Sequence, residues 1–397
     1  MDNLQLLKPA DVKLHSRANI LYTIYKSGKE GISQSGVARE TGLPAPTIFR
    51  NFVTLEERGL IEPMEVELDE DVKLGKGRRP SLYRIKGDAI YLFGIEIVYK
   101  TLEIGVFNLM LEKVGEVEYD ILGMEADEIT ALIAKAVEEF IVKLEIPRNK
   151  IGGVGISAPG IIDTKNGIIL KCDAIKNMQD YPIADKLTEA LNLKILLGNN
   201  VDAHAFYEHR YGGHEHKSSF TVLLRYGVNG AYVLNNKVHT DSNDITVDIE
   251  HFIVTPDGPD CTCGEKGCLL AHILNLEGKY DPDILLNLAD YLTTDLKKLD
   301  LITDEIVKYL LVILRNINRW VSPDSFLILA KNDEIAKIIK NKIENAVSGR
   351  AYRYKDDHIK PFYSRAYNHD HGKKGMCELI LAEYMNSPEM LIQVIGD

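Results

Sequence analysis

Apolar positions in the first 86 residues recur with a helical period and then shorten to strand-like runs. Residues 16–28 carry apolar side chains three and four positions apart, which predicts an amphipathic helix that starts at Ser16 and ends at Gly28. Ser33 is expected to cap a second, short helix, and two prolines open a third. The runs LIEPMEVEL and SLYRIKG then predict two strands joined by a basic GKGRRP tip. Two helices with a short glycine-containing turn, followed by such a hairpin, predict a winged helix-turn-helix domain over residues 1–86.

From about residue 87 onward, apolar runs of strand length alternate with longer helical patterns. Residues 91–110 are predicted as two strands, and residues 151–170 as a buried strand that enters a glycine-rich loop before another strand. A helix is expected over residues 202–211, and a second succession of strands and helices starts after residue 219. This alternation predicts an α/β domain that binds small molecules at the ends of its strands.

Charge is unevenly distributed over the 397 residues, whose formal net charge is −12. Through Lys86 there are 14 Lys and Arg residues against 12 Asp and Glu residues, and the remainder of the chain has 33 against 47. Only the N-terminal domain is therefore suited to face the phosphates of a nucleic acid. The chain begins without a basic segment followed by an apolar run and has no apolar stretch of membrane length, which predicts a cytoplasmic protein with reduced thiols and no membrane partner.

The third predicted helix carries the residues that would read DNA. Side chains in the first half of such a helix can reach base edges in the major groove, and here these are Thr47, Arg50 and Asn51. The wing tip would contact phosphates or a narrow minor groove through three cations: Lys76, Arg78 and Arg79. The alternative interpretation is that Arg50 and Asn51 are solvated helix positions and that the wing is a charged turn.

Three of the five cysteines lie close together in the run CTCGEKGC. In a reducing compartment such a cluster indicates metal binding more than disulfides. Structural zinc sites take four tetrahedral thiolate or imidazole ligands, and glycines let a short loop wrap around the ion, so Cys261, Cys263 and Cys268 are expected to supply three ligands. His272 is a candidate for the fourth, and the alternative to zinc is three packed or surface thiols.

Four motifs occur together in the order and spacing of one family: GVGISAPGIID, NNVDAHAFYEHRYG, the HF pair of DIEHFIV, and CTCGEKGCL. With the N-terminal domain in front of them, the chain resembles the sugar-responsive transcriptional repressors of the ROK family (repressor, open reading frame, kinase). The resemblance implies a two-lobed actin-like ATPase domain of the sugar-kinase type over residues 87–397, with lobes of about 87–198 plus the C-terminal segment and 199–372. It also implies a zinc ion with His251 as the fourth ligand, and His272 stays as the competing histidine.

The kinases of this family hold ATP phosphates on glycine-rich loops that this chain lacks at the matching positions. Val98 and Tyr99 replace the glycines after the first strand, and Tyr226 stands where a threonine is usual. A Gly-Gly pair of the kinases corresponds to Ala330 and Lys331. Such side chains would fill the space that a close approach of backbone to phosphates requires.

The resemblance also places Asn200 at the position of the catalytic aspartate. An amide cannot accept the proton of a sugar hydroxyl, although it can still hydrogen-bond one. Asp202 is the one candidate to replace the missing base. These departures predict a protein without kinase activity, and the alternative is an active ROK sugar kinase that carries a DNA-binding domain.

A sugar pocket is still implied by the positions that contact the ligand in the family. They correspond here to Asn199, Asn200, Asp248 and His251, of which Asp248 matches the glutamate of a Gly-Glu-Ile-Gly-His run and His251 would touch both sugar and zinc. The glutamate that usually follows the last cysteine is Leu270 here. The effector is therefore expected to differ from glucose or an N-acetylhexosamine.

The sequence thus predicts a zinc-containing, ligand-responsive repressor of carbohydrate-utilisation genes. It would bind operator DNA and a sugar or sugar-like effector, and it would act as a homodimer, as symmetric DNA readers usually do. Besides the active kinase, two alternatives are a scaffold that is controlled by a protein partner and a decayed pocket that binds nothing.

Overall fold

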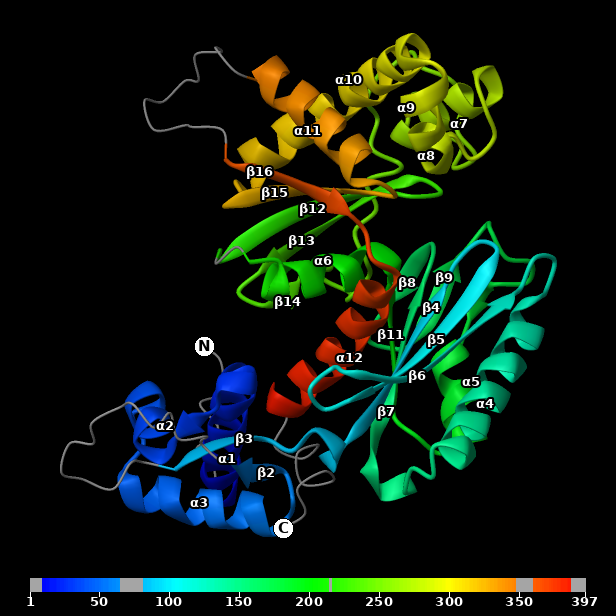
Figure 1. Ribbon diagram of the computed structural model, residues 1–397. Coiled ribbons are helices and arrows are strands. Elements are labelled where there is room, and N and C mark those ends of the chain that lie inside the picture. Colours follow the sequence, from blue (N-terminus) through cyan, green and yellow to red (C-terminus); the bar gives the residue numbers. More distant parts are fainter. Residues whose placement is uncertain (1–8, 65–80, 214–215, 348–359, 387–397) are drawn as a thin grey trace.

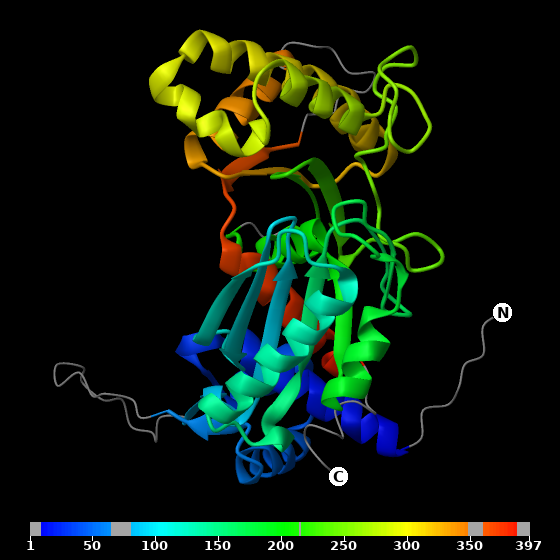
Figure 2. The ribbon, with the colours of Figure 1, turned by 90° about the vertical axis from the view of Figure 1, so that its right-hand side faces the viewer.

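The computed structural model describes residues 9–64, 81–213, 216–347 and 360–386, which form an N-terminal unit and two α/β lobes (Figure 1). The second lobe stands at one end of the molecule, above the first lobe, and the N-terminal unit lies at the opposite end (Figure 2). The N-terminal unit thus lies beside the first lobe (Figure 1).

Three helices and a small antiparallel sheet make up the N-terminal unit. Its elements are α1 (Pro9–Lys26), β1 (Ile32–Ser33), α2 (Gln34–Thr41), α3 (Ala45–Glu57), β2 (Ile61–Pro63) and β3 (Leu82–Ile85). The sheet has the strand order β1-β3-β2. The helices and the sheet pack around the buried side chains of Ile20, Phe52 and Leu55, and this core continues into the first lobe and the last helix through Phe107 and Ile380.

Local sequence signals explain most boundaries in this unit. Ser33 caps α2, because its hydroxyl oxygen accepts a hydrogen bond from the backbone N–H of Gly36 at 3.1 Å. Gly42 ends α2 with φ at 69°, a left-handed conformation that glycine adopts without strain. The prediction that the first helix starts at Ser16 is wrong: α1 begins at Pro9, and proline is tolerated in the first turn of a helix.

The first lobe is built on a mixed five-stranded sheet. Its elements are β4 (Tyr91–Ile97), β5 (Thr101–Asn108), β6 (Lys113–Asp120), α4 (Ala126–Lys143), β7 (Ile151–Ala158), β8 (Ile161–Asp163), β9 (Ile168–Lys171), β10 (Gln179–Tyr181), α5 (Ile183–Leu191) and β11 (Ile195–Asn199). The main sheet has the order β11-β7-β4-β5-β6, and β8, β9 and β10 form a smaller sheet. The helices α4 and α5 bury their apolar faces on one side of the main sheet (Figure 1).

The second lobe repeats this plan. Its elements are α6 (Asn200–Tyr211), β12 (Ser218–Leu224), β13 (Val228–Leu234), β14 (Lys237–Val238), α7 (Leu269–Lys279), α8 (Ile284–Asn287), α9 (Tyr291–Thr294), α10 (Leu296–Trp320), β15 (Ser325–Ala330), α11 (Asp333–Val347) and β16 (Phe362–Ala366). The sheet order is β14-β13-β12-β15-β16. The helices α7 to α11 gather on its outer face, and α6 covers the face toward the first lobe (Figure 1).

Both main sheets share one topology, in which three antiparallel strands are extended by two parallel ones. In the first lobe β7 and β11 run parallel to β4, and in the second β15 and β16 run parallel to β12. The last helix, α12 (His369–Asn386), returns to the first lobe and packs against α6, β4 and β7. The repeat confirms the predicted two-lobed α/β fold of the actin-like type.

Within the described residues, no helix is long and apolar enough to cross a membrane. The longest, α10, has 25 residues, but it exposes charged side chains such as Asp300, Asp304 and Lys308 along one face. Its apolar residues instead pack on the sheet of the second lobe.

Candidate functional site

A cavity of about 480 Å³ opens between the two lobes. The structure brings together there all four residues that the family resemblance assigned to the ligand: Asn199, Asn200, Asp248 and His251. Three residues that the sequence analysis assigned to altered phosphate loops also line the cavity, namely Val98, Tyr99 and Tyr226, as does Leu270. Ala330 and Lys331, at the third predicted loop, are not among its lining residues.

Asn199 and Asn200 stand where β11 passes into α6. Asn199 is the N-cap of α6: its Oδ1 accepts a hydrogen bond from the N–H of Val201 at 2.9 Å, and its Nδ2 donates to the carbonyl oxygen of Gly160 at 2.7 Å. Asn200 Nδ2 donates to the carbonyl oxygen of Ile97 at 3.0 Å. The predicted helix start at residue 202 is therefore two residues late, and each asparagine gives one of its two side-chain N–H groups to a backbone carbonyl. Asn200 Oδ1 is buried, and no residue in the described part of the chain donates to it.

The run from residue 248 to residue 251 supplies three polar side chains to the cavity. Asp248 Oδ1 accepts a hydrogen bond from the backbone N–H of Glu250 at 2.8 Å, and its Oδ2 lies 3.7 Å from His251 Nε2. Glu250 packs against Gly227, where a Cβ atom would lie only 2.1 Å from Glu250 Oε1. Burial, reinforced by the neighbouring Asp248 carboxylate, raises the pKa of Glu250 to about 7.

A group of possible metal ligands lies on the other side of His251. The ligand atoms of His251, Cys261, Cys263 and Cys268 all lie within 4.8 Å of one another. Cys261 Sγ is 3.5 Å from His251 Nδ1, and Cys263 Sγ is 3.7 Å from Cys268 Sγ. Tetrahedral ligands at zinc–ligand distances would be separated by about 3.5–3.8 Å, so these residues fit such an ion. His251 is thus placed to face a metal with Nδ1 and the cavity with Nε2.

His272, the competing histidine, is not part of this group. Its Nε2 lies 2.6 Å from Thr255 Oγ1, and its ring stacks on Tyr309 with the centroids 3.9 Å apart. Of the two candidate histidines, the structure brings only His251 to the three thiols.

Arg225 forms a buried ionic link at the base of the cleft. Its Nη1 lies 2.6 Å from Oε1 of Glu96, near the end of β4, and both side chains are buried. Burial opposes ionisation of Glu96, but Arg225 and then His204 outweigh it and hold the pKa of Glu96 at about 2. Arg225 also lies 3.6 Å from Glu103, which pairs with Lys373 of α12 at 3.2 Å. An internal cation therefore neutralises the carboxylates at this end of the first sheet.

Two contacts join the lobes at the mouth of the cleft. The rings of Tyr99 and Tyr226 meet edge to face with their centroids 5.9 Å apart. Lys100 Nζ pairs with Asp283 Oδ2 at 2.7 Å and lies 5.9 Å from the centroid of the Tyr226 ring. Bulky side chains of both lobes thus meet at this edge of the cleft.

Asp202, the candidate replacement for the catalytic base, lies in the interior of the protein. Its side chain is 4% exposed and is not among the groups that line the cavity. Burial raises the pKa of Asp202 to about 8. A buried acid away from the cleft is not placed to take a proton from a ligand.

The Asp202→Asn variant is expected to be more stable than the wild type at pH 7.5. Because the pKa is raised in the folded state, the Asp202 contribution to stability is fully present below about pH 4 and is lost as the pH rises towards 8. Removing this titration should raise the free energy of unfolding by about 2–4 kcal/mol at pH 7.5 and leave it nearly unchanged at pH 4. Urea unfolding at both pH values measures this, with the exposed Asp185→Asn as control; equal gains at both pH values would contradict it.

The residues predicted to read DNA lie in different environments. Arg50 is exposed on α3, where its Nε donates to the carbonyl oxygen of Pro46 at 3.1 Å, and Thr47 is half-buried. Asn51 is 6% exposed: its Oδ1 accepts from Arg17 Nε at 3.2 Å, and its Nδ2 donates to the carbonyl oxygen of Thr47 at 2.9 Å. The prediction that Asn51 contacts a base is corrected, because this side chain ties α3 to α1 inside the unit. The three wing cations, Lys76, Arg78 and Arg79, lie outside the described residues.

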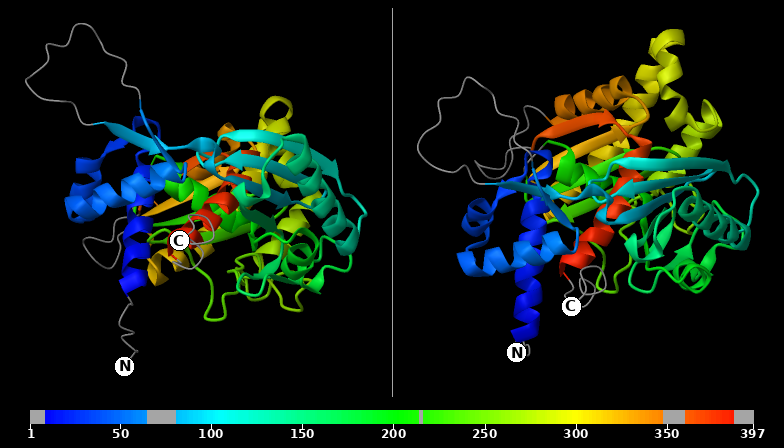
Figure 3. Two further views of the ribbon diagram at one scale, coloured as in Figure 1. Left: turned by 90° about the horizontal axis from the view of Figure 1, so that it is seen from below. Right: turned by 60° about the horizontal axis from the view of Figure 1, so that its bottom comes forward.

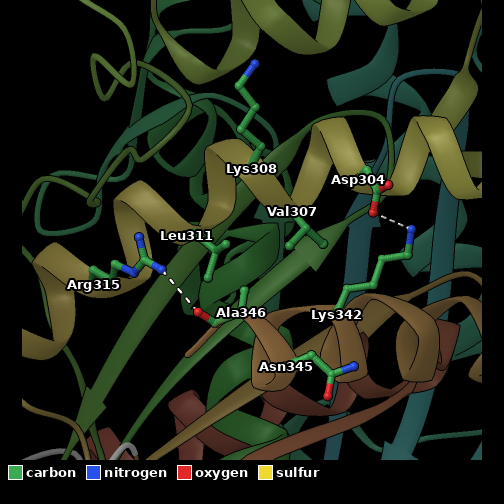
Figure 4. Close-up of a pocket in the computed structure, with 8 residues that line it drawn as sticks. All are labelled: Asp304, Val307, Lys308, Leu311, Arg315, Lys342, Asn345 and Ala346. Atoms are coloured by element: carbon green, nitrogen blue, oxygen red, sulfur yellow. Dashed lines mark hydrogen bonds and ion pairs between the residues drawn. The ribbon is translucent and has the colours of Figure 1, made fainter. Parts of the chain in front are cut away.

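A second hollow, of about 630 Å³, lies on the outer face of the second lobe between α10 and α11 (Figure 4). Its charged groups are satisfied within the lobe: Lys342 pairs with Asp304 at 2.6 Å, and Arg315 donates to the carbonyl oxygen of Ala346 at 3.4 Å. None of the predicted site residues lines it. The cavity between the lobes is therefore the candidate site.

Sequence reasoning missed Glu250, Arg225 and the pair of Lys100 with Asp283. Glu250 carried a signal, since it departs from the glycine that precedes the histidine in the Gly-Glu-Ile-Gly-His run. Arg225 carried none, because its partner Glu96 lies 129 positions away in the chain and only the fold brings the two together.

Known proteins with similar sequences and folds share one family name. The ROK family profile matches residues 92–280. The xylose repressor of Bacillus subtilis (strain 168) is 24% identical over 334 residues, which cover 81% of this chain and 84% of the repressor, and the glucokinase of Thermotoga maritima is 29% identical over 184 residues, which cover 45% and 56%. A solved structure described as a ROK family transcriptional regulator, a homolog of the E. coli MLC protein, matches with a TM-score of 0.78 at 18% identity and covers 97% of this chain and 100% of its own. Over most of its length the chain is thus similar to proteins of the ROK family.

Proposed function

We propose that the protein is a sugar-responsive transcriptional repressor whose kinase-like domain binds an effector without phosphorylating it. One observation carries the proposal: Asn199, Asp248 and His251 converge on one cavity, and the rings of Tyr99 and Tyr226 meet at positions where the related kinases are expected to hold phosphates. The match to a xylose repressor along 81% of the chain favours regulation, since the match to a glucokinase covers 45%. The regulated genes would be those of carbohydrate use.

The metal in this proposal is zinc, held by His251 and the three cysteines of the 261–268 loop. Three thiolates and one imidazole in a tetrahedral arrangement suit zinc, and four protein ligands leave no open position for a reacting water. The ion would therefore be structural. It would fix the ring of His251, whose Nε2 faces Asp248 in the cavity.

No phosphoryl transfer from ATP to a hexose is expected. Phosphate transfer needs backbone or cationic groups that cradle the phosphates, and here Val98 and Tyr99 stand in the first loop while Arg225 is bound to Glu96. Millimolar ATP with Mg²⁺ should accordingly shift the melting temperature by less than about 1 °C, because an unbound ligand adds no stability. Turnover above a no-enzyme control that persists through repurification would favour the rival proposal of an active kinase.

The N-terminal unit would bind operator DNA as a winged helix-turn-helix, with Arg50 of α3 reading bases. Arg50→Ala is expected to lower the preference for a selected operator over random duplex by roughly 10-fold, since one bidentate base contact is worth about 1–3 kcal/mol. Fluorescence anisotropy on duplexes selected from a random pool measures this ratio. Arg319→Ala, which removes the same charge from the exposed end of α10, is the matched control.

If Arg50→Ala lowers the affinity for operator and for random DNA by the same factor, Arg50 does not read bases and contacts only phosphates. A separate prediction concerns the wing cations Arg78 and Arg79: replacing them with alanine should make DNA binding less dependent on salt concentration.

A homodimer is the proposed assembly, since two-fold operators match two-fold proteins. Sedimentation with operator DNA gives the stoichiometry.

Two helices connect the cleft to the N-terminal unit. The helix α6 starts in the cleft, with Asn199 as its cap, and ends about 18 Å away at Tyr211. The helix α12 starts beside the cleft, where His369 pairs with Glu103 at 2.8 Å, and runs along α6 to α1 (Figure 3). Any rotation of one lobe against the other would therefore be transmitted to the N-terminal unit.

The end of α6 and the middle of α12 meet α1 in a polar group that we name the Glu378 cluster. It consists of Tyr22, Tyr25, Arg210, Tyr211 and Glu378. Arg210 Nη1 pairs with Glu378 Oε2 at 2.7 Å, and its Nη2 donates to the Tyr22 hydroxyl at 3.1 Å. The hydroxyls of Tyr25 and Tyr211 both donate to Glu378 Oε1, and Glu378 is fully buried. Because a buried carboxylate is costly without its partners, α6, α12 and α1 are expected to move together.

A further inference from the structure

The cleft between the lobes is acidic. Five carboxyl groups line it: those of Asp173, Asp248, Glu250, Glu277 and Asp283. Two cations line it, and both are paired: Lys171 with Asp173 at 3.2 Å, and Arg225 with Glu96 at 2.6 Å. Among the described residues that line the cleft, no lysine or arginine is thus left to bind an anionic ligand.

The hydrogen-bonding groups of the inner cleft also favour a ligand that donates hydrogen bonds over an anionic one. Asn199 and Asn200 each give one of their two side-chain N–H groups to a backbone carbonyl, whereas the Asp248 and Glu250 carboxyls can accept further hydrogen bonds. A sugar hydroxyl can donate to such oxygens. A phosphate dianion is an acceptor only and would add negative charge beside them.

Glu250 has the most specific position among these carboxyl groups. It lies between Asp248 and the 225–229 loop, and Gly227 provides the space for it, since a Cβ atom there would be 2.1 Å from Glu250 Oε1. It is therefore built into the wall of the cavity, next to Asp248 and the 225–229 loop.

We infer that the effector is a hydroxyl-rich molecule without a phosphate or carboxylate group, and that Glu250 determines this specificity by receiving a ligand hydroxyl and repelling anions. This inference rests on the proposed role of the cleft as effector site. It adds to that role the chemical class of the ligand: a free sugar or polyol, and not a sugar phosphate.

The test uses matched pairs of probes on the full-length, zinc-loaded protein. Thermal shift and isothermal titration calorimetry compare D-glucose with glucose 6-phosphate, N-acetylglucosamine with its 6-phosphate, and D-xylose and xylitol with xylulose 5-phosphate. The unphosphorylated member of at least one pair should bind at least about 10-fold more tightly than its phosphate. The carboxylates of the cleft accept hydrogen bonds from sugar hydroxyls, and the same carboxylates repel a phosphate group. Glu250→Gln should lower the affinity for the free sugar several-fold and reduce the ratio of the affinities for the sugar and its phosphate.

The control is Glu189→Gln, which removes the same charge from an exposed position of α5 and should leave both affinities unchanged. Zinc content and operator binding verify that the Glu250→Gln protein is folded. Tighter binding of the phosphate, no binding of any free sugar or polyol in the panel, or an unchanged ratio in Glu250→Gln would each overturn the inference. Operator binding reports separately on the proposed function, so a repressor that responds to a sugar phosphate would refute only the ligand class.

Discussion

Cys263→Ser protein is expected to lose its zinc and to melt about 10 °C or more below the wild type. The binding energy of a structural zinc is folding energy, which amounts to about 10–16 kcal/mol in small zinc domains. Cys263 is exposed and contributes little packing, so the loss can be assigned to the metal and not to a cavity. Metal analysis of the purified protein gives the zinc content, and calorimetry gives the melting temperature.

The control for this experiment is Cys172→Ser. Cys172 is a free cysteine outside the ligand group, so its replacement should leave about one zinc per chain. Treating the wild type with a strong chelator should reproduce the instability of the Cys263→Ser protein. A wild-type protein that is zinc-free and fully stable would refute the metal site.

The Tyr25→Phe/Tyr211→Phe double variant is expected to bind operator DNA but to respond weakly to the effector. Coupling between two sites of one protein is typically about 5–150-fold in affinity, and the variant should fall below about 3-fold. Both hydroxyls donate to Glu378, at the junction of α1, α6 and α12, and phenylalanine keeps the rings while removing those bonds. The measurement is the operator Kd with and without the sugar that gives the largest thermal shift.

Tyr309→Phe is the matched control, since the Tyr309 hydroxyl also donates to a carboxylate, that of Glu305, at 3.3 Å, but within α10 of the second lobe. It should respond like the wild type. If the double variant releases DNA at the wild-type effector concentration and by the wild-type factor, the Glu378 cluster does not carry the signal. If it no longer binds DNA at all, the cluster supports the N-terminal unit rather than its regulation.

The two predictions concern opposite ends of one connected path. His251 belongs to the group of possible metal ligands and faces Asp248 in the cleft, and α6 leads from the cleft to Tyr211 and Glu378. A defect at the metal group should therefore reduce both stability and response, whereas a defect at the Glu378 cluster should reduce the response alone. Measuring zinc content, operator affinity and effector response on one set of variants separates these cases.

The sequence by itself determined the features that depend on near neighbours. The alternation of strands and helices, the cap at Ser33 and the three thiols of the 261–268 loop follow from side chains a few positions apart, and the structure contains each of them. The substitutions at Val98 and Tyr99 were equally visible, because a loop that cradles phosphates needs glycine at fixed positions.

Only the tertiary structure decided which distant side chains meet. His251 and not His272 reaches the thiols, Asn51 turns inward to Arg17, and Arg225 neutralises Glu96 from the other lobe. Periodicity assigns a residue to a face of its helix or strand, but it does not specify what covers that face. The free energy of burying a charge depends on its partner, since an unpaired ion in the interior is far more costly than a paired one. Only the fold determines which partner is present.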